Sequence, residues 1–470
     1  MTLSIPAATY EQARGPHLRA MLAGLAEESE KLTWPLERLH HLRDERLRTL
    51  IRHAQRHSPW HSHRLRHIDL EALSGADLTA IPPMTKTDVM AHWDDIVTDR
   101  RLTLRGAREH LARVSAEGPA YLLDDYHVVT TGGSSGLVGL FPWDRDGWLA
   151  AALSSWRVFA WLARTMNLAQ PGRTAFVAAA HASHVSEAMR RTFEPPGISC
   201  EIPVTLPLAE IVARLNAFRP DRIIAYPSML RRLAFERRAG RLTVAPQVML
   251  GGAEPLPPRM RADIEEAFDA PVVNFYATSE TWTMACSPPG RTELHLAEDV
   301  AVYEPVDHDG NPVPPGRRAA KILVTNVINK VFPLIRYEIA DEVTLLDGPN
   351  TEVWSGRRIA PVQGRHDDLF DYGDGVVVHP YIFWTPLWDA RIAHYQVRQT
   401  PRGADVLVEL RERLSLDTVR DELAAALRRA GLADPAVDVT AVDRIARAPM
   451  SGKIRSFVPL PRPAAGPARP

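Results

Sequence analysis

The sequence is poor in cysteine, in long apolar runs and in net charge, and each shortage excludes a class of protein. Its 470 residues include two cysteines, Cys200 and Cys286, so at most one disulfide and no cysteine-rich zinc site can form. The best apolar stretch, around residues 151–163, is broken by Arg157 and is shorter than the roughly 18 residues of a membrane-spanning helix. Because 56 basic residues face 57 acidic ones, we expect no nucleic-acid and no membrane partner.

Lysine is also scarce. Of the 56 basic residues, five are lysines, namely Lys31, Lys86, Lys321, Lys330 and Lys453. The excess of arginine and alanine is the ordinary consequence of a GC-rich genome, and a lysine kept against that bias is a candidate for chemistry. The first 16 residues lack the basic-then-apolar layout of a signal peptide, so we expect a cytoplasmic protein.

The middle of the chain alternates short apolar runs with amphipathic stretches. Strands are expected at 174–179, 223–226, 248–250 and 272–276, and helices at 184–193, 208–218 and 257–268, with Ser228 as the N-cap of a further helix. Repeated βα units predict an α/β fold with a mostly parallel, buried sheet flanked by helices. Ligands of such sheets bind at the carboxyl ends of strands, so the loops after Leu250 and Tyr276 are candidate site loops.

The two ends of the chain differ from this middle. Residues 17–70 look helical, and we interpret their many histidines as a polar face, since no tight pair has metal-ligand spacing. Strands are expected at 320–325 and 343–346, and residues 405–458 as a small α+β unit. We therefore expect an N-terminal domain over 1–363 with a helical lead-in to about residue 80, a mobile C-terminal cap over 364–458 and a disordered tail over 459–470.

Glycines and hydroxyl residues gather in one segment, Thr130-Thr131-Gly132-Gly133-Ser134-Ser135-Gly136. Glycines let the backbone approach an anion closely, while N–H groups and hydroxyls donate to phosphate oxygens. The segment differs from the P-loop, because no lysine follows its last glycine. On its own, such a segment is also typical of an ordinary flexible loop.

Five further motifs follow this segment in order. They are Gly251-Gly252-Ala253-Glu254, Tyr276-Ala277-Thr278-Ser279-Glu280, Tyr337-Glu338-Ile339-Ala340-Asp341, Gly364-Arg365-His366-Asp367-Asp368 and Pro449-Met450-Ser451-Gly452-Lys453-Ile454. Together the six resemble the adenylate-forming enzymes, the superfamily of acyl-CoA synthetases, peptide-synthetase adenylation domains and luciferases. The helical lead-in and Pro83-Met84-Thr85-Lys86-Thr87-Asp88 are most similar to its phenylacetate-CoA ligase branch.

The resemblance implies ATP and Mg²⁺ as cofactors and gives each motif a role. The residues expected to bind ATP or AMP are Thr131, Gly133, Ser134, Ser135, Gly136, Gly252, Ala253, Glu254, Asn274, Tyr276, Ser279 and Asp341. Of these, Tyr276 would stack on adenine and Asp341 would accept from the ribose hydroxyls, with the catalytic Arg365 nearby. The hard Mg²⁺ ion suits the carboxylate of Glu280. Lys453 would reach in from the cap to the bridging oxygen, Asp367 would act as the hinge, and His181 and Gly251 would line the substrate pocket.

The implied reaction activates a small, aryl carboxylic acid as acyl-AMP, releases pyrophosphate and transfers the acyl group to CoA. Three departures leave the acceptor open: Leu137 stands where many relatives have lysine, Ala277 replaces a glycine, and Glu338-Ile339-Ala340 replaces Arg-Thr-Gly with Arg336 as a compensating neighbour. The alternatives are transfer to an amine, activation of nitrite to diazotise an aryl amine, and a non-catalytic nucleotide-binding pseudoenzyme. Whether the chain forms a homodimer is also left open.

Overall fold

The computed structural model separates the chain into two compact units, Met1–Val362 and Gln363–Pro470. It describes residues 7–131, 138–168, 172–178, 185–193, 198–348, 353–362, 369–373, 376–378, 380–383, 386–387, 389, 391–447 and 454–460. Each unit has its own hydrophobic core, and the first holds every element that the sequence analysis assigned to the α/β middle.

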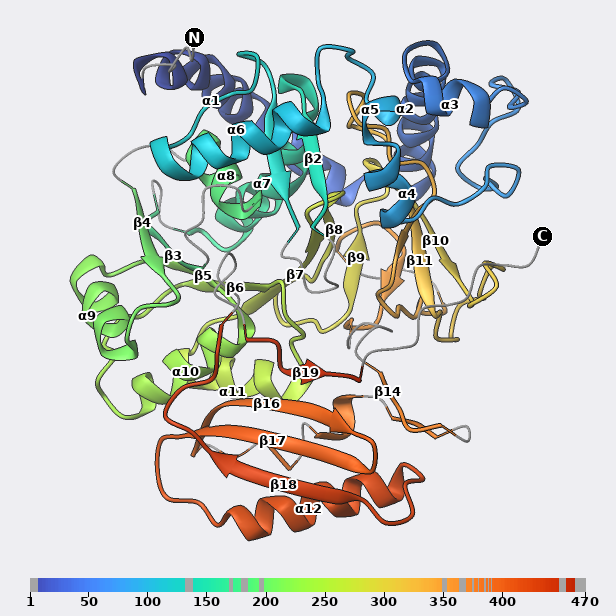
Figure 1. Ribbon diagram of the computed structural model, residues 1–470. Coiled ribbons are helices and arrows are strands. Elements are labelled where there is room, and N and C mark those ends of the chain that lie inside the picture. Colours follow the sequence, from blue (N-terminus) through green and yellow to red (C-terminus); the bar gives the residue numbers. More distant parts are fainter. Residues whose placement is uncertain are drawn as a thin grey trace. The chain divides into compact units, whose positions relative to one another are not determined.

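Helices make up the first part of unit 1 (Figure 1). They are α1 (Ala7–Glu30), the 3₁₀ helix η1 (Lys31–Thr33), α2 (Leu36–His57), α3 (Pro59–Arg64), α4 (Lys86–Ala91), α5 (Trp93–Ile96) and α6 (Leu104–Glu117). Helix α2 buries Leu39, Leu47, Leu50 and Ile51 along one side, as its apolar period predicts. Helix α4 begins with a capping box, in which Thr85 and Asp88 each bind the other's backbone N–H.

An eight-stranded sheet forms the centre of unit 1, in the order β13-β9-β8-β7-β6-β5-β3-β4. The strands are β3 (Thr174–Ala178), β4 (Ser199–Pro203), β5 (Arg222–Ala225), β6 (Val248–Gly252), β7 (Val272–Thr278), β8 (Trp282–Cys286), β9 (Leu294–Leu296) and β13 (Arg358–Ile359). The strands β4, β3, β5, β6 and β7 run parallel, whereas β8, β9 and β13 are antiparallel. The expected α/β fold with a mostly parallel sheet is confirmed.

Buried apolar side chains point alternately to the two faces of this sheet, and helices cover both faces. Met249 of β6 joins a core with α9 (Leu208–Phe218), α10 (Pro227–Arg238) and α11 (Pro258–Phe268). Its neighbours Val248 and Leu250 join a different core with α7 (Arg145–Thr165). Helix α8 (Val185–Phe193) packs into the core of the helical lead-in. Because successive side chains point to opposite faces, one buried strand serves both helical layers.

Two smaller sheets complete unit 1. The hairpin of β1 (His127–Thr130) and β2 (Leu140–Trp143) flanks residues 131–139, and β10 (Ala301–Val306), β11 (Lys321–Asn326) and β12 (Tyr337–Ile339) form an antiparallel sheet. The prediction of a strand at 343–346 is wrong, because Thr344 and Leu345 make only isolated bridges. Their two bridge partners lie on opposite sides of the segment, so no continuous ladder forms.

Unit 2 is a small α+β unit. Its elements are β14 (Phe370–Asp371), β15 (Val377–Val378), the 3₁₀ helix η3 (Pro380–Phe383), β16 (Ile392–Thr400), β17 (Gly403–Leu410), α12 (Leu416–Arg429), β18 (Ala436–Ala441) and β19 (Phe457–Val458). The larger sheet has the order β18-β17-β16-β19, and α12 buries Leu423 and Leu427 in its core. The sequence analysis placed β17, α12 and β18 but did not anticipate β16, the longest strand of this unit.

Within the part of the chain that the structure describes, no helix is both long and apolar enough to cross a bilayer. The same residues hold no group of three or more histidine, cysteine or carboxylate side chains placed to bind a metal ion.

Candidate functional site

The candidate site begins where β6 and β7 end side by side. The two strands are parallel, and Gly251 pairs with Asn274 and Gly252 with Phe275. A Cβ atom on Gly252 would lie 3.2 Å from the carbonyl oxygen of Phe275, so glycine permits this close approach of the two backbones. The turn then passes through Ala253, whose φ of 65° is rare for a residue with a side chain. The parallel register thus brings the motifs 251–254 and 276–280 to one edge.

The carboxylate of Glu254 has a structural partner at this edge. Its Oε2 accepts the backbone N–H of Ser228 at 3.0 Å, in the first turn of α10. The expectation that Ser228 caps this helix is wrong, because α10 starts at Pro227 and Ser228 lies inside it. A carboxylate from the next loop stabilises the unpaired N–H groups and the positive end of the helix. Glu254 therefore fixes the start of α10 against the site loop.

Two distant motifs meet through one hydrogen bond. The hydroxyl of Tyr276 donates to Oδ2 of Asp341 at 2.8 Å, across 65 positions of sequence. Asp341 is buried with 5% of its surface exposed. The residues expected at adenine and at ribose are therefore adjacent. Asn274, from the same strand, is buried and is held by Ser287, whose Oγ accepts the Asn274 N–H at 2.9 Å.

A second such pair joins Glu280 to the neighbouring sheet. Oε1 of Glu280 accepts the hydroxyl of Tyr337 at 3.2 Å, and the Tyr337 ring is buried with 2% exposed. Tyr337 is itself fixed by Met84, whose N–H donates to the carbonyl of Arg336 at 3.0 Å and whose carbonyl accepts the N–H of Glu338 at 2.9 Å. The segment before α4 thus forms a short parallel bridge beside β12.

The replaced residues of the motif at 337–341 have partners of their own. Glu338 forms an ion pair with Lys321 at 2.8 Å. The guanidinium of Arg336 donates to Glu304 and to the carbonyl of Ile81, and its compensating role stays a prediction. Of this motif, Tyr337 and Asp341 contribute the side chains that contact Glu280 and Tyr276.

Sequence reasoning missed the role of Lys86. Its Nζ donates to Oγ1 of Thr131 at 2.9 Å, although the two residues lie 45 positions apart. Thr131 also accepts the N–H of Gly139 at 2.9 Å, and Oγ of Ser279 donates to the carbonyl of Thr130 at 3.0 Å. The lysine and the β7–β8 turn therefore both contact the residues that begin the glycine-rich segment. The scarcity of lysine and the motif at 83–88 were the two signals that could have singled it out.

Several expected site residues lie outside the described residues. They are Gly133, Ser134, Ser135, Gly136, His181, Arg365, Asp367 and Lys453. For these residues, the roles expected from the sequence stay predictions.

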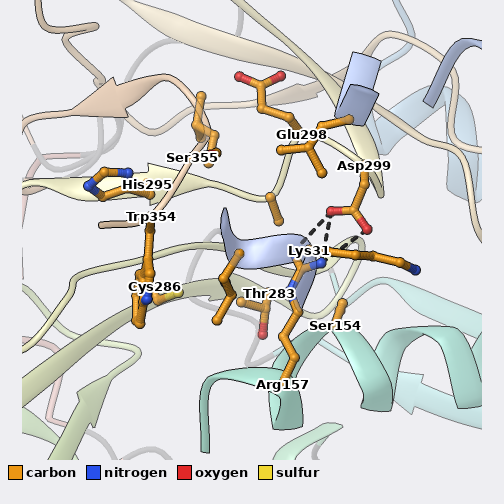
Figure 2. Close-up of a pocket in the computed structure, with 14 residues that line it drawn as sticks. Lys31, Ser154, Arg157, Thr283, Cys286, His295, Glu298, Asp299, Trp354 and Ser355 are labelled. Carbon is orange, nitrogen blue, oxygen red and sulfur yellow. Dashed lines mark hydrogen bonds and ion pairs between the residues drawn. The ribbon is translucent and has the colours of Figure 1, made fainter. Parts of the chain in front are cut away.

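A buried charged cluster lies elsewhere in unit 1, around a small enclosed cavity (Figure 2). Arg157 reaches Asp299 with both terminal nitrogens, each 3.0 Å from Oδ1. Burial alone would raise the pKa of Asp299, but the guanidinium groups of Arg157 and Arg46 outweigh burial and lower it. The cavity measures about 20 Å³, enough for about one water molecule. The cluster is therefore an internal ionic network and cannot hold an organic substrate.

Three comparisons relate the chain to known proteins. No family model matches it. It is 30% identical to Protein CapK of Staphylococcus aureus over 162 residues, which are 34% of each chain. It is 27% identical to the phenylacetate-coenzyme A ligase of Escherichia coli (strain K12) over 403 residues, or 81% of this chain and 84% of that one. It is also 27% identical to the ligase of that name from Thermus thermophilus, over 75% of this chain and 76% of that one.

Solved structures show the same fold at lower identity. The 2-hydroxyisobutyryl-CoA ligase in its postadenylation state, in complex with 2-HIB-AMP, has a TM-score of 0.67 at 19% identity and covers 92% of this chain and 91% of that chain. The O-succinylbenzoate coenzyme A synthetase from Bacillus subtilis, in complex with ATP and magnesium ion, has a TM-score of 0.50 at 17% identity over 70% of this chain and 68% of that chain.

Proposed function

Because the chain belongs to the ANL superfamily of adenylate-forming enzymes and is phenylacetate-CoA ligase-like, we propose that it activates a small aryl carboxylic acid with ATP and transfers the acyl group to CoA. In the first step a carboxylate oxygen bonds to the α-phosphorus of ATP and pyrophosphate leaves. In the second, the CoA sulfur bonds to the acyl carbon, the thiol proton is lost and AMP leaves. Both steps depend mainly on positioning and on neutralisation of charge.

The observation that carries this proposal is the meeting of four separate segments at one edge of the sheet. Tyr276 contacts Asp341, Glu280 contacts Tyr337, and Lys86 contacts Thr131, at the carboxyl end of β7 and around it. A nucleotide needs an aromatic face, an acceptor for its ribose hydroxyls and cations or N–H groups for its phosphates. These three contacts bring such groups together from positions between 86 and 341.

Mg²⁺ fits the donor set. Glu280 supplies a carboxylate whose second oxygen is not used by Tyr337, and hydroxyls of Thr131 and Ser279 lie on neighbouring segments. Hard oxygen donors of this kind are the ligands that Mg²⁺ prefers. When bound, the ion would neutralise phosphate charge. Within the chain, Tyr337 orients the Glu280 carboxylate. Lys86 adds positive charge beside Thr131, the first described residue of a segment whose sequence has leucine at 137 instead of lysine.

Glu280→Gln tests the metal role. We expect it to raise the Mg²⁺ concentration needed for half-maximal activity and to lower the rate, with a nearly unchanged melting temperature, because an amide oxygen is a weaker ligand for a hard cation. Pyrophosphate exchange across a Mg²⁺ titration measures this. Tyr337→Phe is the matched control, since it removes the hydrogen bond and keeps the carboxylate. A sharp fall in melting temperature with normal Mg²⁺ dependence would make Glu280 a structural residue.

Lys86→Met tests whether Lys86 supplies the positive charge for the phosphates of ATP. We expect the KM for ATP in pyrophosphate exchange to rise about tenfold or more, as for loss of a charge-assisted hydrogen bond. Lys86→Arg should recover part of the loss, because it restores the charge. The side chain is half-exposed, so the melting temperature should change little. An unchanged KM for ATP in Lys86→Met would remove Lys86 from the phosphate site.

The substrate and acceptor are tested by one panel. Pyrophosphate exchange is measured with aryl acids, fatty acids, amino acids and nitrite, and the activated acid is then offered CoA or an amine. Exchange with an aryl acid followed by thioester formation supports the proposal. Exchange with nitrite, or product only with an amine, would replace it with the corresponding alternative. Absence of exchange with every acid would favour a pseudoenzyme.

A further inference from the structure

The helical lead-in concentrates positive charge. Residues 36–67 contain eight arginines and seven histidines against three carboxylates, a net charge of +5 with neutral imidazoles, whereas the whole chain carries −1. Part of this charge is neutralised internally: Arg43 and Arg46 form ion pairs with Glu298 and Asp299. The arginines at the end of the segment have no such partners, and they line a pocket.

This pocket lies on the surface beside α3. It is open and measures about 650 Å³, and its walls are Pro59, Trp60, His63, Arg64, Arg66, His67, Pro82 and Asp95. Ligand sites commonly measure about 300–1,000 Å³. The volume therefore suits a nucleotide-sized ligand, in contrast to the cavity of about 20 Å³ at the buried ionic network. The pocket contains none of the residues assigned above to the nucleotide site.

The side chain of Arg64 is fixed by contacts within the protein. Its Nη2 donates to the carbonyl oxygens of Pro82 and Ile335, the latter at 3.0 Å, and its guanidinium lies over the Trp60 ring, 5.0 Å from the ring centre. Its Nη1 is buried and has no hydrogen-bond partner among the described residues. Burial, together with the charge of Arg336, lowers the pKa of Arg64 to about 10, so the group is still cationic at neutral pH.

Arg66 provides a second cation at the rim. It donates to Nε2 of His63 at 2.6 Å and to Nε2 of His67 at 2.7 Å. Neither Arg64 nor Arg66 has a carboxylate within ion-pair distance among the described residues, and Asp95 is the one acid in the pocket wall. Two guanidinium groups lie in one pocket and neither is paired with a carboxylate, so the pocket favours an anion. The planar set of donors in arginine matches the geometry of phosphate oxygens.

We propose that this pocket binds a phosphate-bearing anion, with phosphate oxygens on the guanidinium of Arg66 and the positive charge of Arg64, a residue of the pocket wall, beside them. The pocket contains no residue of the proposed adenylation site. CoA and pyrophosphate are also ligands of the proposed reaction, so binding is assigned to this pocket by its dependence on Arg66. Two sources share this chemistry, namely a phosphate ester such as CoA and free inorganic pyrophosphate. Arg64 donates to the carbonyl of Ile335, two residues before Tyr337, so the pocket wall is linked through Arg64 to the segment that contacts Glu280.

The test uses calorimetric titration of the full chain with CoA and with inorganic pyrophosphate. Arg66→Ala changes an exposed pocket residue, and we expect it to weaken binding of the preferred probe about tenfold. Arg56→Ala, an exposed arginine of the same segment outside the pocket wall, is the matched control and should leave binding unchanged. Binding should also weaken as salt is raised, because the contacts are ionic.

A second variant separates this pocket from the nucleotide site. Lys86→Met should leave the Arg66-dependent binding event intact. Tighter binding of CoA would identify an ester as the source, and equal binding of pyrophosphate would identify free phosphate; either supports the proposal. Equal affinities of wild type and Arg66→Ala for both probes would overturn it, as would binding of polyglutamate without binding of either phosphate probe, which would indicate an acidic protein partner. A failure of pyrophosphate exchange with every acid would overturn the proposed function alone.

Discussion

Replacing Lys453 with alanine is expected to slow acyl-adenylate formation by about 10²-fold or more, the effect of losing a preorganised electrostatic group. The reason is chemical: negative charge develops on the α-phosphate and on the attacking oxygen, and a cation from the cap would stabilise it. Acyl transfer from a chemically supplied adenylate should change much less. Pyrophosphate exchange measures the first step and thioester formation from the supplied adenylate measures the second.

The lysine shortage provides a matched control for this experiment. Lys330 is exposed on unit 1 and takes part in none of the motifs, so Lys330→Ala should behave as the unchanged protein in both steps. If Lys453→Ala loses both steps equally, the substitution damages the fold, and Lys453 has no specific part in the first step. If it loses neither, the resemblance at 449–454 does not carry the catalytic lysine.

The largest expected effect on stability lies in the buried ionic network of Figure 2. Arg157→Met leaves Asp299 with 1% of its surface exposed and without its two-pronged partner. Removing one member of a buried pair costs about 3–5 kcal/mol of unfolding free energy. The double variant Arg157→Met, Asp299→Leu should recover most of this loss, since well-packed apolar side chains replace buried pairs at little cost.

Urea unfolding, followed by tryptophan fluorescence, measures the unfolding free energy of these variants, because nine of the eleven tryptophans lie in unit 1. Arg105→Met serves as the control: its pair with Glu109 is exposed, with 90% and 67% of the side chains accessible, so we expect less than about 0.5 kcal/mol. The depressed pKa of Asp299 means that the network stabilises fully at neutral pH and loses its effect as pH falls below about 4. A loss under 1 kcal/mol in Arg157→Met at pH 7 would contradict this account.

Sequence reasoning succeeded where the signal is local. The alternation of apolar residues in β6, with Met249 on one face and Leu250 on the other, is visible in the sequence and gives a buried parallel strand. The motif pattern also assigns Tyr276 and Asp341 to one nucleotide site; their side chains are in contact, and their roles stay predictions. Both inferences rest on residues that are close in sequence or on a motif of fixed order.

It failed where distant segments decide the outcome. Ser228 has the side chain of an N-cap, but the carboxylate of Glu254, 26 positions later, binds the first turn instead. Lys86 lies two residues after the bridge between Met84 and Tyr337, and it contacts Thr131 across 45 positions. The charged network joins Arg43 to Glu298 across 255 positions, a pairing that no local pattern predicts. Such contacts depend on topology, which single-sequence periodicity does not contain.

The contacts of the lead-in have a consequence for synthesis of the chain. Arg43 and Arg46 find their partners at residues 298–299, and Met84 finds its partner at residue 337. The helices at the N-terminus leave the ribosome first, yet their charged and strand partners are translated about 250 residues later. At a translation rate of about 5–20 residues per second, these helices lack their partners for at least about ten seconds. The part of the chain that is made first is therefore completed late, because its apolar side chains share a core with residues 284–345 that are not yet translated.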